Sequence, residues 1–136
     1  MRDFSREETV AEFHRAFGHA IDVTPDTDLI TLRNRLIFEE YSELRDELAA
    51  AMVDVETLGE ITSKTKQRIL KEMADLQYVL SGLAVVLGLP LHVAFNRVHK
   101  SNMSKLGAYG KPILREDGKI LKGPNYAPPD LEDLVE

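Results

Sequence analysis

Two acidic motifs, each set in a stretch of helical periodicity, constrain the fold of this 136-residue chain more than any other feature. The first contains Glu39, Glu40 and Glu43, and it follows residues 29–36, where leucines recur at helical spacing. On a helical wheel with about 100° per residue, these leucines and the three glutamates share one face. The glutamates therefore stand where a helix that served only a core would carry leucine, and we expect them to point inward.

The second motif, Glu72 and Asp75, lies in a later stretch of the same periodicity. Glu72 stands three residues after Ile69 and four residues before Leu76, which places it on the apolar face of its helix. Asp75 falls about 60° to one side of that face. Two helices thus carry inward carboxylates, and we expect the two motifs to meet.

Five carboxylates that point into one interior require cations if they are to remain ionised. Neither motif contains Cys or His, and ligand sets made only of oxygen suit hard ions. The sequence therefore predicts a site for Mg²⁺, with Mn²⁺ as a substitute. The alternative is that these acids lie on a solvated helix face, as most acids of charge-rich helices do.

Composition limits the other classes of function. The net charge of −6 argues against binding of a nucleic-acid polymer. The chain has no cysteine, which excludes disulfides and thiolate sites. No apolar stretch is long enough to predict a membrane span, and the charged residues 1–8 do not resemble a signal peptide. We expect a cytoplasmic protein.

The pattern of caps and breakers predicts an all-α fold, a four-helix bundle-like core over about residues 5–105. The four expected helices cover roughly residues 5–17, 27–53, 63–88 and 90–104. Val85, Val86 and Leu87 lie partly off the apolar stripe of the third helix, and they are candidates to face a partner chain. His14 and His19 are expected at the surface or in a loop, because neither has an acidic or histidine partner at helical spacing.

A tail rich in Gly and Pro follows at about residues 106–136, and we assign core and tail to a single domain over residues 1–136. Within the tail, Asp117-Gly118 lies between two apolar segments and predicts a β-hairpin with a two-residue loop. Basic residues also gather from position 97 onward. Because lysines contact phosphate oxygens in polyphosphate sites that hold metal ions, the tail and the acidic motifs together indicate hydrolysis of a nucleotide phosphate.

The acidic motifs resemble those of the all-α nucleoside triphosphate pyrophosphohydrolase superfamily, which includes the MazG proteins. In the segment Ser101-Asn102-Met103-Ser104-Lys105, and in residues 117–124, the chain is similar to the short MazG-like branch. The similarity covers roughly residues 9–131 and is greatest to the MazG-like dUTP pyrophosphatases.

The resemblance implies Mg²⁺-dependent cleavage of dUTP, or of related nucleotides such as dUDP, to the monophosphate. It implies a homodimer whose active site is shared between chains, with two or more metal ions. The implied metal ligands are Glu40, Glu43, Glu72 and Asp75, with Glu39 as a further ligand or as the residue that orients the attacking water. Glu39 and Glu40 are the implied catalytic pair. The implied substrate contacts are Asn102, Lys105, Lys119 and Lys122.

Three alternatives remain open from the residues alone. A broad-specificity enzyme that removes noncanonical nucleotides would use the same metal site. A non-catalytic metal-binding helical dimer would tolerate the loss of one carboxylate. A di-iron carboxylate bundle agrees least with the sequence, because di-iron sites use Glu-x-x-His pairs and neither acidic motif contains His.

Overall fold

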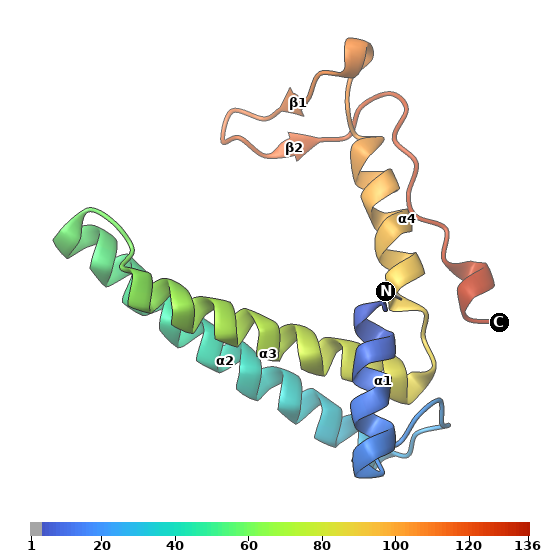
Figure 1. Ribbon diagram of the computed structural model, residues 1–136. Helices are drawn as coiled ribbons and strands as arrows, with labels where there is room; N and C mark the ends of the chain where they lie inside the picture. Colours follow the sequence, from blue (N-terminus) through green and yellow to red (C-terminus); the bar gives the residue numbers. More distant parts are fainter. Residues whose placement is uncertain (1–3) are drawn as a thin grey trace. The chain divides into compact units, whose positions relative to one another are not determined.

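A computed structural model describes residues 4–136, and within that range the chain is mainly helical. The helices are α1 (Arg6–Phe17), α2 (Thr27–Leu58), α3 (Ser63–Leu87) and α4 (Leu91–Met103), as Figure 1 shows. Two single 3-10 turns, Ala108–Gly110 and Glu132–Leu134, and the short strands β1 (Ile113–Leu114) and β2 (Ile120–Leu121) lie in the tail. The all-α prediction is confirmed.

Helix boundaries follow the local signals of the sequence. The Ser5 side chain accepts a hydrogen bond from the Glu8 backbone N–H, and the Glu8 carboxylate accepts one from the Ser5 backbone N–H. Helix α1 therefore begins with a capping box. The Asp26 side chain accepts from the Leu29 N–H at the start of α2, and the Thr62 hydroxyl accepts from the Thr65 N–H at the start of α3. The second helix was predicted to end near residue 53, but it continues to Leu58, where Gly59 in the left-handed conformation (φ 80°) ends it.

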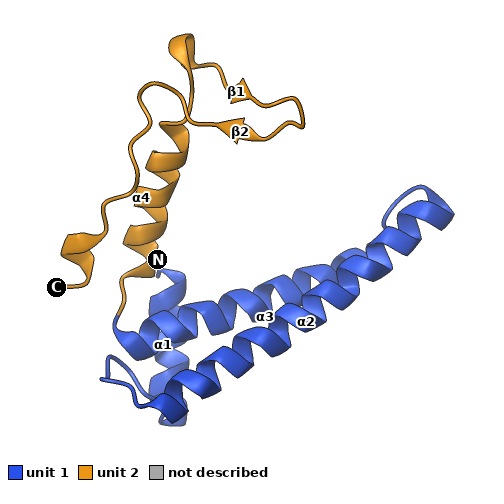
Figure 2. Ribbon diagram, turned by 180° about the vertical axis from the view of Figure 1, so that it is seen from behind, with its two compact units in different colours: residues 1–88 blue, residues 89–136 orange. Residues whose placement is uncertain are grey.

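The chain divides into two compact units, Met1–Gly88 and Leu89–Glu136, shown in separate colours in Figure 2. In unit 1, α2 and α3 pack along one another and are joined by residues 59–62, and α1 packs against α3. The buried apolar core of unit 1 consists of Val10, Ala51, Ala84, Val85 and Val86. Val85 and Val86 therefore pack inside this chain, and the expectation that they face a partner is wrong.

Unit 2 consists of α4 and the tail. The two strands pair antiparallel, with Ile113 opposite Leu121 and Leu114 opposite Ile120. Gly118 has a φ of 87°, and its N–H donates to the Arg115 carbonyl at 2.9 Å. The Arg115 N–H also donates to the Lys119 carbonyl at 2.9 Å, so the hairpin is confirmed but its loop has three residues, 116–118, rather than two.

The tail then returns along α4. The Ser101 hydroxyl donates to the Ala127 carbonyl at 2.7 Å, and the Ala127 N–H donates to the Ser104 hydroxyl oxygen at 3.0 Å. Arg97 donates to the Asp130 carbonyl at 3.0 Å and pairs with Asp133. These polar contacts, rather than a large apolar core, fix the tail on the helix.

Within residues 4–136, no single helix is both long and apolar enough to span a membrane. By length and composition alone, α3 and α4 pass that test only when they are taken together as a broken pair.

Candidate metal centre

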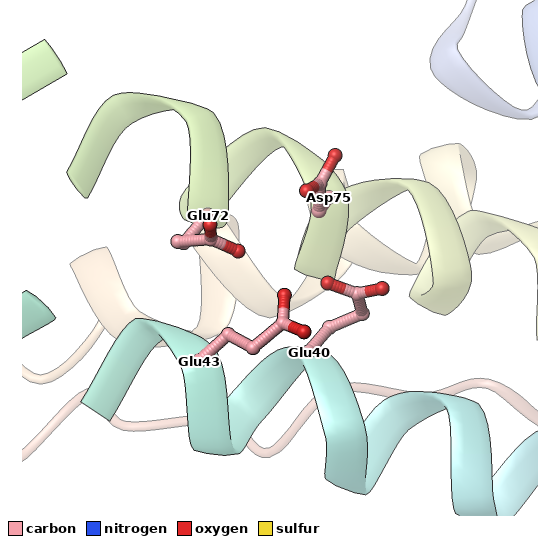
Figure 3. A group of neighbouring side chains, drawn as sticks. All are labelled: Glu40, Glu43, Glu72 and Asp75. Carbon is pink, nitrogen blue, oxygen red and sulfur yellow. The ribbon is translucent and has the colours of Figure 1, made fainter. Parts of the chain in front are cut away.

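Four carboxylates meet between α2 and α3. Glu40 and Glu43 come from successive turns of α2, and Glu72 and Asp75 come from successive turns of α3 (Figure 3). One oxygen of each lies within 4.8 Å of one oxygen of every other. We call these four residues the acidic cluster. The two motifs that the sequence predicts to meet do meet.

Two oxygens of the acidic cluster are buried without a partner. Glu40 Oε2 and Glu72 Oε2 are shielded from solvent and make no hydrogen bond within the described part of the chain. A buried acceptor without a donor is costly, and for a carboxylate the cost is larger. The cluster is therefore incomplete as an isolated set of side chains.

The crowding changes the proton affinity of the cluster. Burial raises the pKa of Glu40, and the charges of Glu43, Asp75 and Glu72 raise it further. Burial also raises the pKa of Glu72, with a further contribution from a hydrogen bond to Glu43, although Lys71 opposes the shift. Like charges at such short range disfavour one another, and a cation at the centre would remove that repulsion.

One cation of the chain itself already touches the cluster. Lys71 Nζ lies 2.8 Å from Asp75 Oδ2 and 3.4 Å from Glu72 Oε1. Hydrogen bonds to Asp75 and then to Glu72 raise the pKa of the Lys71 ammonium. The lysine side chain is 67% exposed, so it lies at the rim of the cluster and leaves the interior oxygens free for a metal.

The donor set fits a hard divalent cation. Every candidate ligand is a carboxylate oxygen, two of the four residues hold an unpartnered buried oxygen, and the ligands come from two rigid helices. Glu39, which the sequence also placed among the ligands, is exposed and lies outside the group of four.

The predicted substrate contacts belong to unit 2, and none is part of the acidic cluster. Asn102 is exposed on α4, and Lys105 is half-buried just after that helix. The Gly123 N–H donates to the Lys105 carbonyl at 2.9 Å, which brings the backbone beside Lys122 next to Lys105. Lys119 lies at the end of the hairpin loop, where its N–H donates to Asp117 Oδ1 at 3.1 Å.

The sequence interpretation missed a buried basic pair in unit 1. His14 is only 2% exposed and Arg33 only 7%, and both approach Gly82 of α3. The expectation of a surface His14 is wrong, because its Nδ1 lies 2.9 Å from the carbonyl oxygen of Ala20 and the ring is enclosed. His19 is exposed in the loop, as expected. On the helical wheel, Arg33 falls about 20° from Glu40, and this position beside an inward carboxylate could have predicted that Arg33 is buried.

Comparison with known families decides the identity of the fold. Residues 10–102, well over half of the chain, match the family described as phosphoribosyl-ATP pyrophosphohydrolase. The chain belongs to the phosphoribosyl-ATP pyrophosphohydrolase family. No curated protein matches the chain significantly.

Membership of the phosphoribosyl-ATP pyrophosphohydrolase family supports a nucleotide pyrophosphohydrolase activity and an all-helical, MazG-like fold. The family is typically metal-dependent, which agrees with a cluster that could bind a metal. The matched range includes all four carboxylates together with His14, Lys71 and Arg33, and it ends at Asn102. The tail, with the predicted substrate contacts Lys119 and Lys122, lies beyond it.

Proposed function

We propose that this protein is a Mg²⁺-dependent pyrophosphohydrolase that converts dUTP to the monophosphate and pyrophosphate. The observation that carries the proposal is the acidic cluster, with its two unpartnered buried oxygens, in a member of this family. The choice of dUTP rests on the resemblance of the acidic motifs and of residues 101–124 to MazG-like dUTP pyrophosphatases.

Glu40, Glu43, Glu72 and Asp75 would hold the cations, one pair of ligands from each helix. Bound divalent cations would lower the pKa of a coordinated water and offset the charge on the phosphate oxygens. Glu39, exposed beside Glu40, would take a proton from the attacking water. The water adds to phosphorus, the bridging P–O bond between the α- and β-phosphates breaks, and pyrophosphate leaves.

Asn102, Lys105, Lys119 and Lys122 would contact the triphosphate. Lysine ammonium groups pair with phosphate oxygens, and all three lysines are free of ion pairs to acids within residues 4–136. We propose that a homodimer forms and that the tail of one chain completes the site of the other. A cytoplasmic location fits an enzyme that acts on free nucleotides.

The reaction class is tested by incubating the purified protein with single nucleoside triphosphates and Mg²⁺ and then identifying the products. Monophosphate and pyrophosphate, formed fastest from dUTP, would support the whole proposal. The same products from many bases would favour a broad-specificity enzyme. A second candidate substrate, phosphoribosyl-ATP, is favoured by the family match, and a strong preference for it would replace dUTP.

Loss of one ligand is expected to abolish turnover without loss of fold. Glu43→Gln and Asp75→Asn keep side-chain size but remove one charge each from the cluster. Because the cations contribute several kcal/mol to transition-state stabilisation, kcat should fall by about three orders of magnitude. The measurement is pyrophosphate release, with circular dichroism as the control for folding.

Full wild-type activity in EDTA would contradict the metal assignment. Normal turnover by the Asp75→Asn variant would show that the acidic cluster does not carry the reaction. Absence of turnover in the wild type would favour the alternative of a non-catalytic metal-binding dimer.

A further inference from the structure

The buried guanidinium of Arg33 lies against a cavity that the metal chemistry does not use. The cavity, here called the Arg33 pocket, has a volume of about 430 Å³ and lies within unit 1. Its lining includes Phe13, His14, Arg33, Leu36, Tyr78 and Val79. Rings and aliphatic side chains form most of its wall, and Arg33 supplies the cationic group.

Among the described residues, Arg33 has no partner for its charge. The side chain is 7% exposed, its Nε is buried without a hydrogen bond, and it forms no ion pair within residues 4–136. Buried polar groups in folded proteins are almost always satisfied, so an unpaired guanidinium in a pocket indicates a ligand with acceptor atoms.

His14 adds an acceptor beside this donor. Its Nδ1 lies 2.9 Å from the Ala20 carbonyl, and because a carbonyl only accepts, Nδ1 carries the proton. Burial lowers the pKa of His14, and the charge of Arg33 lowers it further, so the ring is neutral near pH 7 and Nε2 is left as an acceptor. A Cβ placed on Gly82 would lie 3.1 Å from Arg33 Nη1 and 3.5 Å from His14 Nε2, so both groups border the same glycine.

The pocket lies one helical turn from the acidic cluster on both helices. Leu36 precedes Glu40 by four residues, and Val79 follows Asp75 by four residues, and each such step is about 6 Å along the helix. A nucleotide whose phosphates are held at the cluster would therefore extend its base toward the pocket. Phe13 and Tyr78, with ring centroids 5.6 Å apart, provide aromatic surface for a planar ring.

We infer that the Arg33 pocket holds the nucleobase, and that Arg33 with His14 selects bases with a ring N–H next to a carbonyl, such as uracil, over bases with an amino group there, such as cytosine. Arginine has only donors, so it pairs with the carbonyl of uracil and opposes the amino group of cytosine. His14 Nε2 accepts the adjacent ring N–H. This inference rests on the proposed function, because it assumes that the phosphates bind at the acidic cluster.

The test is calorimetric binding of dUMP and dCMP in the presence of Mg²⁺, which requires no turnover. Wild-type protein is expected to bind dUMP at least about tenfold more tightly than dCMP, since a site with an unmatched polar group rejects the wrong base. Arg33→Gln replaces donors with an amide that can also accept, and it should reduce this ratio to about threefold or less. Arg35→Gln, on an exposed arginine of the same helix, is the matched control and should keep the wild-type ratio.

Gly82→Ala is the second variant and is used if Arg33→Gln does not fold. Its Cβ would crowd Arg33 Nη1, so dUMP affinity should fall several-fold while dCMP affinity changes little. Equal binding of dUMP and dCMP by the wild type would overturn the inference, as would an unchanged ratio in folded Arg33→Gln. Neither result would contradict the proposal that triphosphates are hydrolysed at the acidic cluster. Conversely, base discrimination through Arg33 without any hydrolysis would overturn the proposed function alone.

Discussion

Lys71 neutralises part of the acidic cluster when no metal is bound. Its ammonium contacts one oxygen each of Glu72 and Asp75, and its positive charge repels a divalent cation held by the other oxygens of the cluster. Lys71→Met should therefore tighten Mg²⁺ or Mn²⁺ binding. Because the lysine is well exposed and its pairing is screened by solvent, we expect a gain of about two- to fivefold.

Isothermal titration of the metal-free protein measures this gain directly. Lys64→Met is the matched control, since Lys64 is exposed on the same helix and forms no ion pair within the described residues. Equal affinities in wild type and Lys71→Met would show that the lysine does not weaken metal binding.

Glu40 gives the metal-free protein a specific pH dependence. Its pKa is raised from 4.5 in the folded state, first by burial and then by neighbouring carboxylates. Such a group binds its proton more tightly when folded, so its contribution to stability is full below pH 4.5 and is lost as the pH rises through the folded-state pKa. His14, whose pKa is lowered from 6.5, acts in the opposite sense, and its contribution declines as the pH falls below 6.5.

Comparison of the wild type with Glu40→Gln in EDTA removes the contribution of His14, because both proteins share it. Denaturant unfolding from about pH 4 to 8 should show the variant gaining stability relative to wild type as the pH rises. Two parallel stability curves would contradict the assignment of this titration to Glu40.

Thr65 fixes the connection between α2 and α3. It is 2% exposed, and its hydroxyl lies 3.0 Å from Thr62 Oγ1 and 3.1 Å from Arg68 Nη2. Asp54 joins the same network through Thr62, whose N–H and hydroxyl both donate to Asp54 Oδ2 at 3.2 Å. The network ties the last turns of α2 to the first turn of α3.

Thr65→Val keeps the shape of the side chain but removes the hydroxyl and leaves its partners unpaired. We expect a loss of about 1–3 kcal/mol in the free energy of unfolding, measured by urea denaturation. Thr57→Val is the control, because Thr57 is exposed and its hydroxyl donates to the Val53 carbonyl of its own helix. The control should change stability by less than about 0.5 kcal/mol, and an equal effect in both variants would mean that the network adds nothing.

The elements differ in how far the sequence could predict them. Ser5, Asp26 and Thr62 carry their signals locally, in the hydrogen bonds that a cap makes within three residues, so the helix starts were predictable. The hairpin loop was not, because Asp-Gly also fits a three-residue loop and the choice depends on the Arg115–Lys119 pairing. The burial of His14 depends on its contact with Ala20, which lies in a loop. The conformation of a loop follows no hydrophobic periodicity, so the sequence did not predict this contact.

At the scale of the whole molecule, the acidic motifs were the most predictable part of the site. Periodicity placed five carboxylates on the face that the two helices share, and Glu40, Glu43, Glu72 and Asp75 do meet there. Glu39, which the same helical wheel placed inward, is exposed, so periodicity alone did not separate it from the other four. The sequence did not predict the division into two units after Gly88. A glycine cap ends a helix in the same way whether or not the next helix belongs to the same unit. Arg33 was passed over because arginine on a charge-rich helix is usually solvated.

The isolated chain leaves an apolar stripe on α2 exposed. Its members recur on one face of the helix, and they are Phe38, Tyr41, Leu48, Met52 and Val55. Exposed apolar stripes of this length are typical of protein interfaces, and this supports the proposed homodimer. Met52→Glu would place a charge within the stripe and should convert a dimer to monomers, as measured by sedimentation velocity.

Met52→Leu is the control, and it should preserve the oligomeric state because size and polarity are kept. A wild-type protein that sediments as a monomer at all concentrations would contradict the homodimer, whatever its activity.

Arg33, Glu40 and Glu43 all stand on one unbroken helix, and this has a consequence for how the family can diverge. One residue inserted between Arg33 and Glu43 would turn everything beyond it by about 100° and shift it by about 1.5 Å, which would separate the base contact from the phosphate site. Deletion would do the same in the opposite direction. Among homologous sequences, length changes should therefore collect in residues 19–25 and 59–62 and be missing from residues 33–43, even where the individual side chains have drifted.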